Sequence, residues 1–190
     1  MQPEEDIVII HQVLQGDQNA YRLIVDKHKY HVLNLIYRIV GNREEAEDLA
    51  QDVFVKVYQK LGSFKEQSKF STWLYRIAYN EAVSTMRKRK VEWTEINEVN
   101  AIAHDEAFFD DYENTDELKA HYLPRALKEL NADDQLLISL YYQQMLSVSD
   151  IEAVVGLSQS NIKIRLYRAR KSLHSIISNY ILNHQLQPNG

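Results

Sequence analysis

The sequence predicts an all-α protein of two small helical domains joined by an acidic linker, with a helix-turn-helix in the second domain. Only five glycines and three prolines interrupt 190 residues, and few segments alternate apolar with polar side chains as half-buried strands do. Residues 91–123 contain ten acidic side chains and one basic side chain, whereas the blocks on either side are mildly basic. We therefore predict a first domain at 1–90, a linker at 91–116 and a second domain at 117–190.

Composition excludes several classes of protein. The chain has no cysteine, which excludes disulfides and cysteine-ligated zinc. No apolar run approaches the roughly 20 residues of a membrane-spanning helix. The acidic start, "MQPEEDIVII", does not match a secretory signal. We expect a cytoplasmic protein without membrane insertion.

The first domain is expected to hold four helices. The first covers Pro3 to Leu14, and the second runs from about Asn19 to Val40 and stops at Gly41. The apolar side of the second helix is predicted at helical spacing, although the histidines at 28 and 31 interrupt it. Its predicted members are Leu23, Ile24, Leu33, Ile36, Tyr37 and Val40.

The third helix begins with the acidic stretch "REEAEDLAQDVFVKV". Asn42 suits its N-cap, and Glu45 follows three residues later as in a capping box. Because its apolar stripe is formed by other positions, Asp48, Gln51 and Asp52 must face away from the core. This surface fits a docking site for a basic partner; a merely solvated face and a metal site remain as alternatives. The stripe consists of Ala46, Ala50, Val53, Val57 and Leu61.

The fourth helix starts near Ser71 and ends in the basic run Arg87 to Lys90. Tyr75, Tyr79 and Asn80 lie on it, and such aromatic and amide side chains stack on or hydrogen-bond to unpaired bases. The basic end suits phosphates. A solvated helix end is the alternative, because cations are favoured at helix C-termini.

A helix-turn-helix is predicted within "SVSDIEAVVGLSQSNIKIRLYRAR". Ser147 and Asp150 form a capping box, Gly156 ends the short helix, and Ser158 caps the long one. The inner face of the long helix is predicted to contain Ile162, Leu166, Ala169, Leu173 and Ile176. Its outer face, flanked by Asn161, Arg165 and Arg168, suits the major groove of DNA, with a solvated basic helix as the alternative. That outer face consists of Lys163, Ile164, Tyr167 and Lys171.

Together the stretches "REEAEDLAQDVFVKVYQKLGSF", "FSTWLYRIAYNEAVSTMRKRK" and "LSVSDIEAVVGLSQSNIKIRLYRARKSL" resemble bacterial sigma factors of the extracytoplasmic-function type. The resemblance covers both basic blocks and therefore most of the chain. It implies a protein that binds core RNA polymerase and directs promoter-specific transcription initiation. The first domain would bind the polymerase clamp and the melted −10 element, and the second would recognise the −35 element. Such proteins are not enzymes.

The resemblance also implies roles for individual residues. Asp48, Gln51 and Asp52 match the polymerase-docking helix. Positions matching the −10 contacts are Ser63, Phe64, Lys65, Tyr79, Asn80, Arg87 and Lys88. Positions matching the −35 contacts are Ser160, Asn161, Lys163, Ile164, Tyr167 and Arg168. The residue types at 79, 161 and 164 depart from those of many relatives, which leaves the promoter sequence open.

The expected partners are core RNA polymerase, promoter DNA and an anti-sigma protein, because many relatives are held inactive by one. No cofactor and no metal are expected. Two other classes remain: a DNA-binding regulator that never joins polymerase, and a helical enzyme or metal protein. The acidic helix and long linker argue against the first, and no catalytic constellation supports the second.

Overall fold

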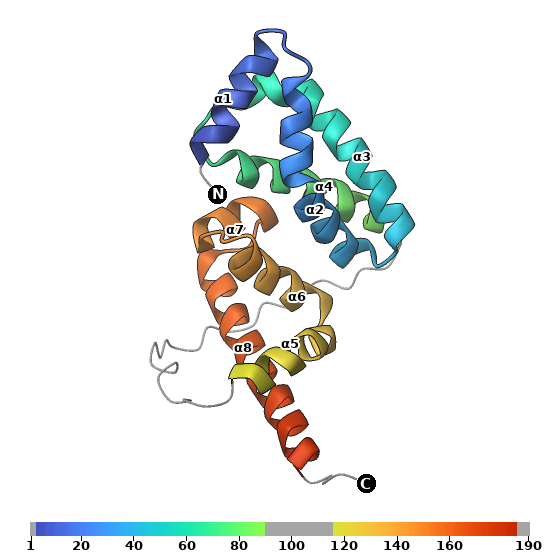
Figure 1. Cartoon of the computed structure of the whole chain (residues 1–190), viewed down its shortest axis with the longest axis vertical. Coiled ribbons are helices and arrows are strands. Elements are labelled where there is room, and N and C mark those ends of the chain that lie inside the picture. The colour runs from blue at the N-terminus through green and yellow to red at the C-terminus, as the bar shows by residue number, and fades with distance from the viewer. Residues whose placement is uncertain (1–2, 90–115, 186–190) are drawn as a thin grey trace.

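The structure is a computed structural model that describes residues 3–89 and 116–185, and within these ranges every regular element is a helix (Figure 1). The prediction of an all-α fold is confirmed. The N-terminal half contains α1 (Pro3–Leu14), α2 (Ala20–Val40), α3 (Arg43–Lys60), the short 3-10 helix η1 (Leu61–Ser63) and α4 (Phe70–Arg89). The C-terminal half contains α5 (Asp116–Glu129), α6 (Ala132–Ile138), the π-helical segment η2 (Ser139–Gln143), α7 (Val148–Val155) and α8 (Gln159–Gln185). None of these described helices is long and apolar enough to cross a membrane.

The predicted helix ends are largely confirmed. The Asn42 side chain accepts a hydrogen bond from the Glu45 N–H at 3.0 Å, which satisfies one of the free donors at the start of α3. Gly41 ends α2 with a φ of 74°, a left-handed conformation that glycine adopts without steric cost. The helix α3 ends at Lys60, two residues before Gly62, because the chain tightens into η1 there.

The core of the N-terminal half is built around α2, which packs against α1, α3 and α4. The predicted stripe of α3 is buried throughout. The predicted stripe of α2 is partly wrong, because Leu23 and Tyr37 are 54% and 47% exposed. His28 does not interrupt the core but lies fully buried within it, where its ring nitrogen Nε2 lies 3.2 Å from a carboxylate oxygen of Asp6. A buried polar ring is tolerated where it has such a partner.

In the C-terminal half, α8 packs against α5, α6 and α7. Four members of its predicted inner face are buried, and Ile176 is half-buried. The capping box of α7 is present in both directions, and Gly156 ends that helix with a φ of 76°. The confirmed buried positions are Ile162, Leu166, Ala169 and Leu173.

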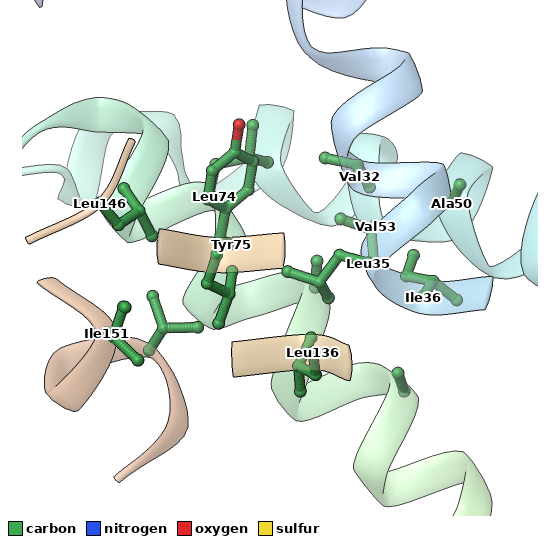
Figure 2. Packing of buried hydrophobic residues seen from close by; sticks show 14 of the residues in the cluster. Val32, Leu35, Ile36, Ala50, Val53, Leu74, Tyr75, Leu136, Leu146 and Ile151 are labelled. Carbon is green, nitrogen blue, oxygen red and sulfur yellow. The ribbon is translucent and has the colours of Figure 1, made fainter. Parts of the chain in front are cut away.

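The two halves share one hydrophobic cluster, which nothing in the local sequence patterns predicted. The helix α4 packs on α7, and α2 packs on α6. Figure 2 shows members of this cluster from both halves: Leu35, Leu74 and Tyr75 come from the first, and Leu136, Leu146 and Ile151 from the second. The second half therefore lies directly on the side of α4 that carries Tyr75.

Candidate binding surfaces

An acidic surface runs along the exposed side of α3. Asp48, Gln51 and Asp52 are all exposed there, one helical turn apart or less, as the sequence predicted. Neither aspartate has an ion-pair partner among the described residues, so both charges are available to another molecule. Glu47, on the same helix, is instead held by Arg43 at 2.8 Å.

A shallow apolar groove between α2 and α3 adjoins this acidic surface. Tyr30 is 68% exposed at the groove, and Val55 on the outer side of α3 is 58% exposed. Large exposed apolar side chains beside charged ones are typical of protein interfaces. The groove is lined by Val25, Lys29, Tyr30, Leu33, Glu47, Ala50, Gln51 and Phe54.

The outer side of α4 is basic and carries one amide. Asn80 is exposed, and Arg87 and Lys88 lie about two turns further along the same side. Arg76 is exposed one turn before Asn80, although it was not among the residues expected from the sequence. The spacing of four residues from Asn80 could have indicated it. These four side chains form a surface with positive charge at both ends.

Two tyrosines of α4 do not join this surface. Tyr75 is 1% exposed, and its hydroxyl donates a hydrogen bond to Gln144 Oε1 at 2.9 Å, so the expectation that it stacks on bases is wrong for this conformation. Tyr79 is half-buried, and burial raises the pKa of its hydroxyl, with the charge of Asp133 adding to the effect. Both tyrosines face the C-terminal half because the helices of that half cover this side of α4.

The segment from Ser63 to Lys69 forms an anchored loop before α4. The ring of Phe64 is half-buried, with its centroid 5.5 Å from those of Phe70 and Trp73. Glu66 has a φ of 57° and binds His11 Nε2 at 2.7 Å. These contacts hold the loop in place while the side chains of Ser63 and Lys65 remain exposed.

The recognition side of α8 is exposed and basic at its N-terminal end. Ser160, Lys163 and Arg168 are exposed, Tyr167 is 48% exposed, and Asn161 and Ile164 are half-buried. Ser158 Oγ accepts from the Asn161 N–H at 3.4 Å, which agrees with its predicted role as the cap. The predicted side chains therefore share one accessible side of the helix.

Arg165 does not flank this side, contrary to expectation. Its guanidinium donates to Asp134 Oδ1 at 3.1 Å and to Asp133 Oδ2 at 3.2 Å, both on α6. This pairing turns Arg165 toward the body of the C-terminal half. A guanidinium satisfied by two carboxylates is not free to contact a base or a phosphate.

Within the described ranges, no three histidine, aspartate or glutamate side chains come together as metal ligands. The acidic surface of α3 therefore offers no described cluster for the metal-site alternative. The predicted linker at 91–116 lies almost entirely outside the described residues, so its role as a linker stays a prediction.

Comparisons with known proteins agree with this arrangement. Residues 24–92 match sigma-70 region 2, and residues 120–173 match sigma-70 region 4. The chain is 35% identical to the ECF RNA polymerase sigma factor SigW of Bacillus subtilis (strain 168), over 86% of this chain and 92% of that protein. It is 32% identical to the RNA polymerase sigma-H factor of Pseudomonas aeruginosa (strain PAO1), over 90% and 92% of the two chains.

Solved structures show the same fold. The sigma factor RpoE of Bartonella quintana, in complex with the anti-sigma factor NepR, has a TM-score of 0.59 and 26% identity, covering 83% of this chain and 96% of that one. CnrH, in complex with the cytosolic domain of CnrY, has a TM-score of 0.61 and 22% identity, and the match covers 90% of this chain and 96% of that one.

These findings define a promoter-specific transcription initiation factor, in which region 2 lies in the N-terminal half and region 4 in the C-terminal half. The chain belongs to the extracytoplasmic-function (ECF) family of RNA polymerase sigma factors. It binds core RNA polymerase and directs initiation at promoters, as this family does.

Proposed function

We propose that the acidic surface of α3 docks on core RNA polymerase while α4 and α8 contact the −10 and −35 promoter elements. The observation that carries this assignment is the separation of charge: unpaired carboxylates lie on α3, and exposed cations lie on α4 and α8. Oppositely charged surfaces orient and speed docking, so each surface selects a partner of the other sign. The groove beside α3 adds apolar area to the polymerase contact.

The −10 contacts are proposed for the outer side of α4 and for the loop before it. The amide of Asn80 suits a base edge, and the cations at 87 and 88 suit phosphates. The ring of Phe64 anchors the loop by packing against Phe70 and Trp73, while the adjacent side chains of Ser63 and Lys65 stay exposed. The proposed set is Ser63, Phe64, Lys65, Asn80, Arg87 and Lys88, together with Tyr79, which is half-buried against the C-terminal half in this conformation.

The −35 contacts are proposed for the exposed side of α8, which would enter the major groove. Arginine and asparagine donate to base edges there, and lysine neutralises phosphates. Arg165 is left out because α6 holds it. The proposed set is Ser160, Asn161, Lys163, Ile164, Tyr167 and Arg168.

We further propose that the first domain spans 1–90, the linker 91–116 and the second domain 117–190. The protein acts by binding its partners and not as an enzyme. We also propose a cytoplasmic location, because core polymerase and promoter DNA are found there. An anti-sigma protein is proposed as a further partner, supported by the RpoE relative that is held by NepR.

Charge reversal on α3 tests the polymerase assignment. Asp48→Arg with Asp52→Arg should abolish binding to core polymerase, because both substitutions replace attraction by repulsion. The neutral pair Asp48→Asn with Asp52→Asn should retain intermediate affinity. Binding is measured by titrating labelled protein with core polymerase, and circular dichroism checks that the helices remain. Unchanged affinity in the folded Arg variant would remove α3 from the docking surface.

A further inference from the structure

One apolar side chain lies within the polar exposed side of α8. Ile164 is half-buried there, at the centre of the side that the proposed function assigns to the −35 element. Its neighbours at three and four residues along the helix all carry hydrogen-bonding groups, so Ile164 is a hydrocarbon surrounded by polar side chains. These neighbours are Ser160, Asn161, Tyr167 and Arg168.

The hydrophobic core does not account for Ile164. Ile162 and Leu166, which are 0% and 2% exposed, belong to the inner face, and two residues along a helix correspond to a rotation of about 200°. Ile164 therefore points away from the buried side. Among the described residues, the half-buried apolar side chains that pack against the hydrophobic cluster do not include it. Helix propensity does not account for it either, because β-branched residues are weaker helix formers than lysine, arginine or glutamine.

The packing of α8 fixes the place of Ile164 on the exposed side. The neighbouring Arg165 forms ion pairs with Asp133 at 3.2 Å and with Asp134 at 3.1 Å, which hold α8 against rotation on α6. A β-branched side chain has one strongly preferred χ1 rotamer in a helix. The methyl groups of Ile164 are consequently presented at a defined place between its polar neighbours.

The major groove of DNA offers one apolar group to such a side chain, the C5 methyl group of thymine. The other base edges there present hydrogen-bond donors and acceptors. A hydrocarbon placed against these edges would leave them without water or another partner, which costs binding free energy. Isoleucine at this place therefore favours thymine and disfavours the other bases.

We propose that Ile164 is a specificity-determining residue for the −35 element and that it recognises the C5 methyl group of a thymine in the major groove. The proposal rests on the proposed placement of α8 in that groove. The polar neighbours of Ile164 contact the adjacent bases and phosphates, and Ile164 selects the base between them.

The test uses the holoenzyme formed from core polymerase and this chain. Promoter duplexes are first selected by the wild-type holoenzyme from DNA randomised across the −35 element. Deoxyuridine, which lacks only the C5 methyl group of thymine, then replaces each thymine of the selected element in turn, on either strand. Competition binding gives the ratio of the affinities for the thymine and uracil duplexes. With the wild type we expect one position at which this ratio is about fourfold, the effect of removing one buried methyl group.

Variants assign this methyl effect to one side chain. Ile164→Ser should bind the thymine and uracil duplexes equally, because the apolar contact is lost, whereas Ile164→Val keeps a branched apolar side chain and should keep most of the ratio. The matched comparison is Lys163→Ala, which should bind both duplexes more weakly with an unchanged ratio, because a phosphate contact carries no base information. Binding to core polymerase, which Ile164→Ser should not alter, shows that this variant is folded.

A gain of contact provides a second arm. At the position found with deoxyuridine, a cytosine duplex is compared with one that carries 5-methylcytosine, which restores the methyl group at the same place in the groove. The wild type should bind the methylated duplex more tightly, and Ile164→Ser should not distinguish the two.

The outcomes separate this role from the placement of α8. A selected −35 element without thymine, equal binding of every uracil duplex by the wild type, or an Ile164→Ser variant that keeps the wild-type ratio would each overturn the role of Ile164 and leave α8 on the −35 element. A selection that yields no preferred −35 sequence would instead overturn the proposed function of α8, and the recognition of thymine with it.

Discussion

The side chain of Asp150 connects the start of α7 to α4 in the other half of the molecule. Its carboxylate accepts hydrogen bonds from the backbone and hydroxyl of Ser147, which starts α7, and from Thr72 on α4. Burial alone would raise the pKa of Asp150, but these hydrogen bonds and the charge of Lys69 outweigh it and hold the pKa below its usual value. Asp150, which completes the capping box of α7, thus also binds the N-terminal half.

At the recognition helix, Arg168→Ala is expected to weaken promoter binding by about 1–3 kcal/mol, the range of a good base contact, and to relax selectivity at the −35 element. Lys163→Ala should weaken binding more uniformly across sequences, because a phosphate contact carries no sequence information. The measurement is competition binding of holoenzyme to promoters with intact and altered −35 elements. Lys128→Ala, an exposed charge loss on α5, is the matched control, and equal binding by all four proteins would refute the assignment.

On α4, Asn80→Ala should impair promoter opening more than polymerase binding. A neutral amide exposed between cations is better suited to an unpaired base than to a phosphate. Permanganate footprinting of the melted region reports opening, and titration with core polymerase reports binding. Asn179→Ala, at an exposed position of α8, provides the control; normal melting by the Asn80 variant would exclude a role in strand capture.

At the scale of elements, the helix-turn-helix depends on how α7 begins and ends. Its eight residues are too few for a stable isolated helix, so the capping box and the turn at Gly156 help to define it. The turn matters most because it sets the direction in which α8 leaves α7. No atom lies within 4 Å of a Cβ built at Gly156, so a side chain there would not clash with a neighbour. The positive φ of the backbone is what disfavours any other residue at this position.

Gly156→Ala should therefore lower the free energy of unfolding of the C-terminal half by about 1–2 kcal/mol, because a side chain is disfavoured in the left-handed conformation. Gly62→Ala is the matched control, since its φ is not in that region and the nearest atom, Leu14 Cδ2, lies at an ordinary 3.8 Å. Denaturant unfolding followed by circular dichroism measures both. An equal loss in the two variants would show that the conformation at Gly156 is not what matters.

At the scale of the whole molecule, each half contains a carboxyl group whose pKa is lowered in the folded protein: Asp6, which is buried, and Asp150, which is half-buried. Burial would raise the pKa of Asp6, but hydrogen bonds and charges from His28 and Lys27 outweigh it and lower the pKa, as happens at Asp150 in the other half. A carboxyl whose pKa is lower in the folded state stabilises the protein above its unfolded pKa of about 4. This stability is lost as the pH falls through the folded pKa.

The melting temperature should accordingly fall steeply as the pH is lowered from about 5 to about 2. Asp6→Asn with Asp150→Asn should be less stable at neutral pH but should show a flatter dependence in the acid range, because two of the linked protons are gone. Calorimetry across this range compares the two proteins. Parallel curves would mean that other carboxyl groups account for acid unfolding.

The sequence by itself determined the helices, their ends and the exposed charged surfaces. These features depend on interactions within a few residues: Asn42 caps α3 through Glu45, and the apolar positions of α3 and α8 recur at the helical period. Asp48, Asn80 and Lys163 are consequently exposed, as their place opposite an apolar stripe requires.

Only the tertiary structure decided which polar side chains remained available. Arg165 looked like a DNA contact until α6 supplied two carboxylates, and Tyr75 looked like a stacking residue until the other half buried it. Thr72 and Asp150 are 78 positions apart, and no local pattern connects them. Their contact depends on the complementary shapes of two assembled surfaces, and it is this long-range packing that brings the two halves of the sigma factor together.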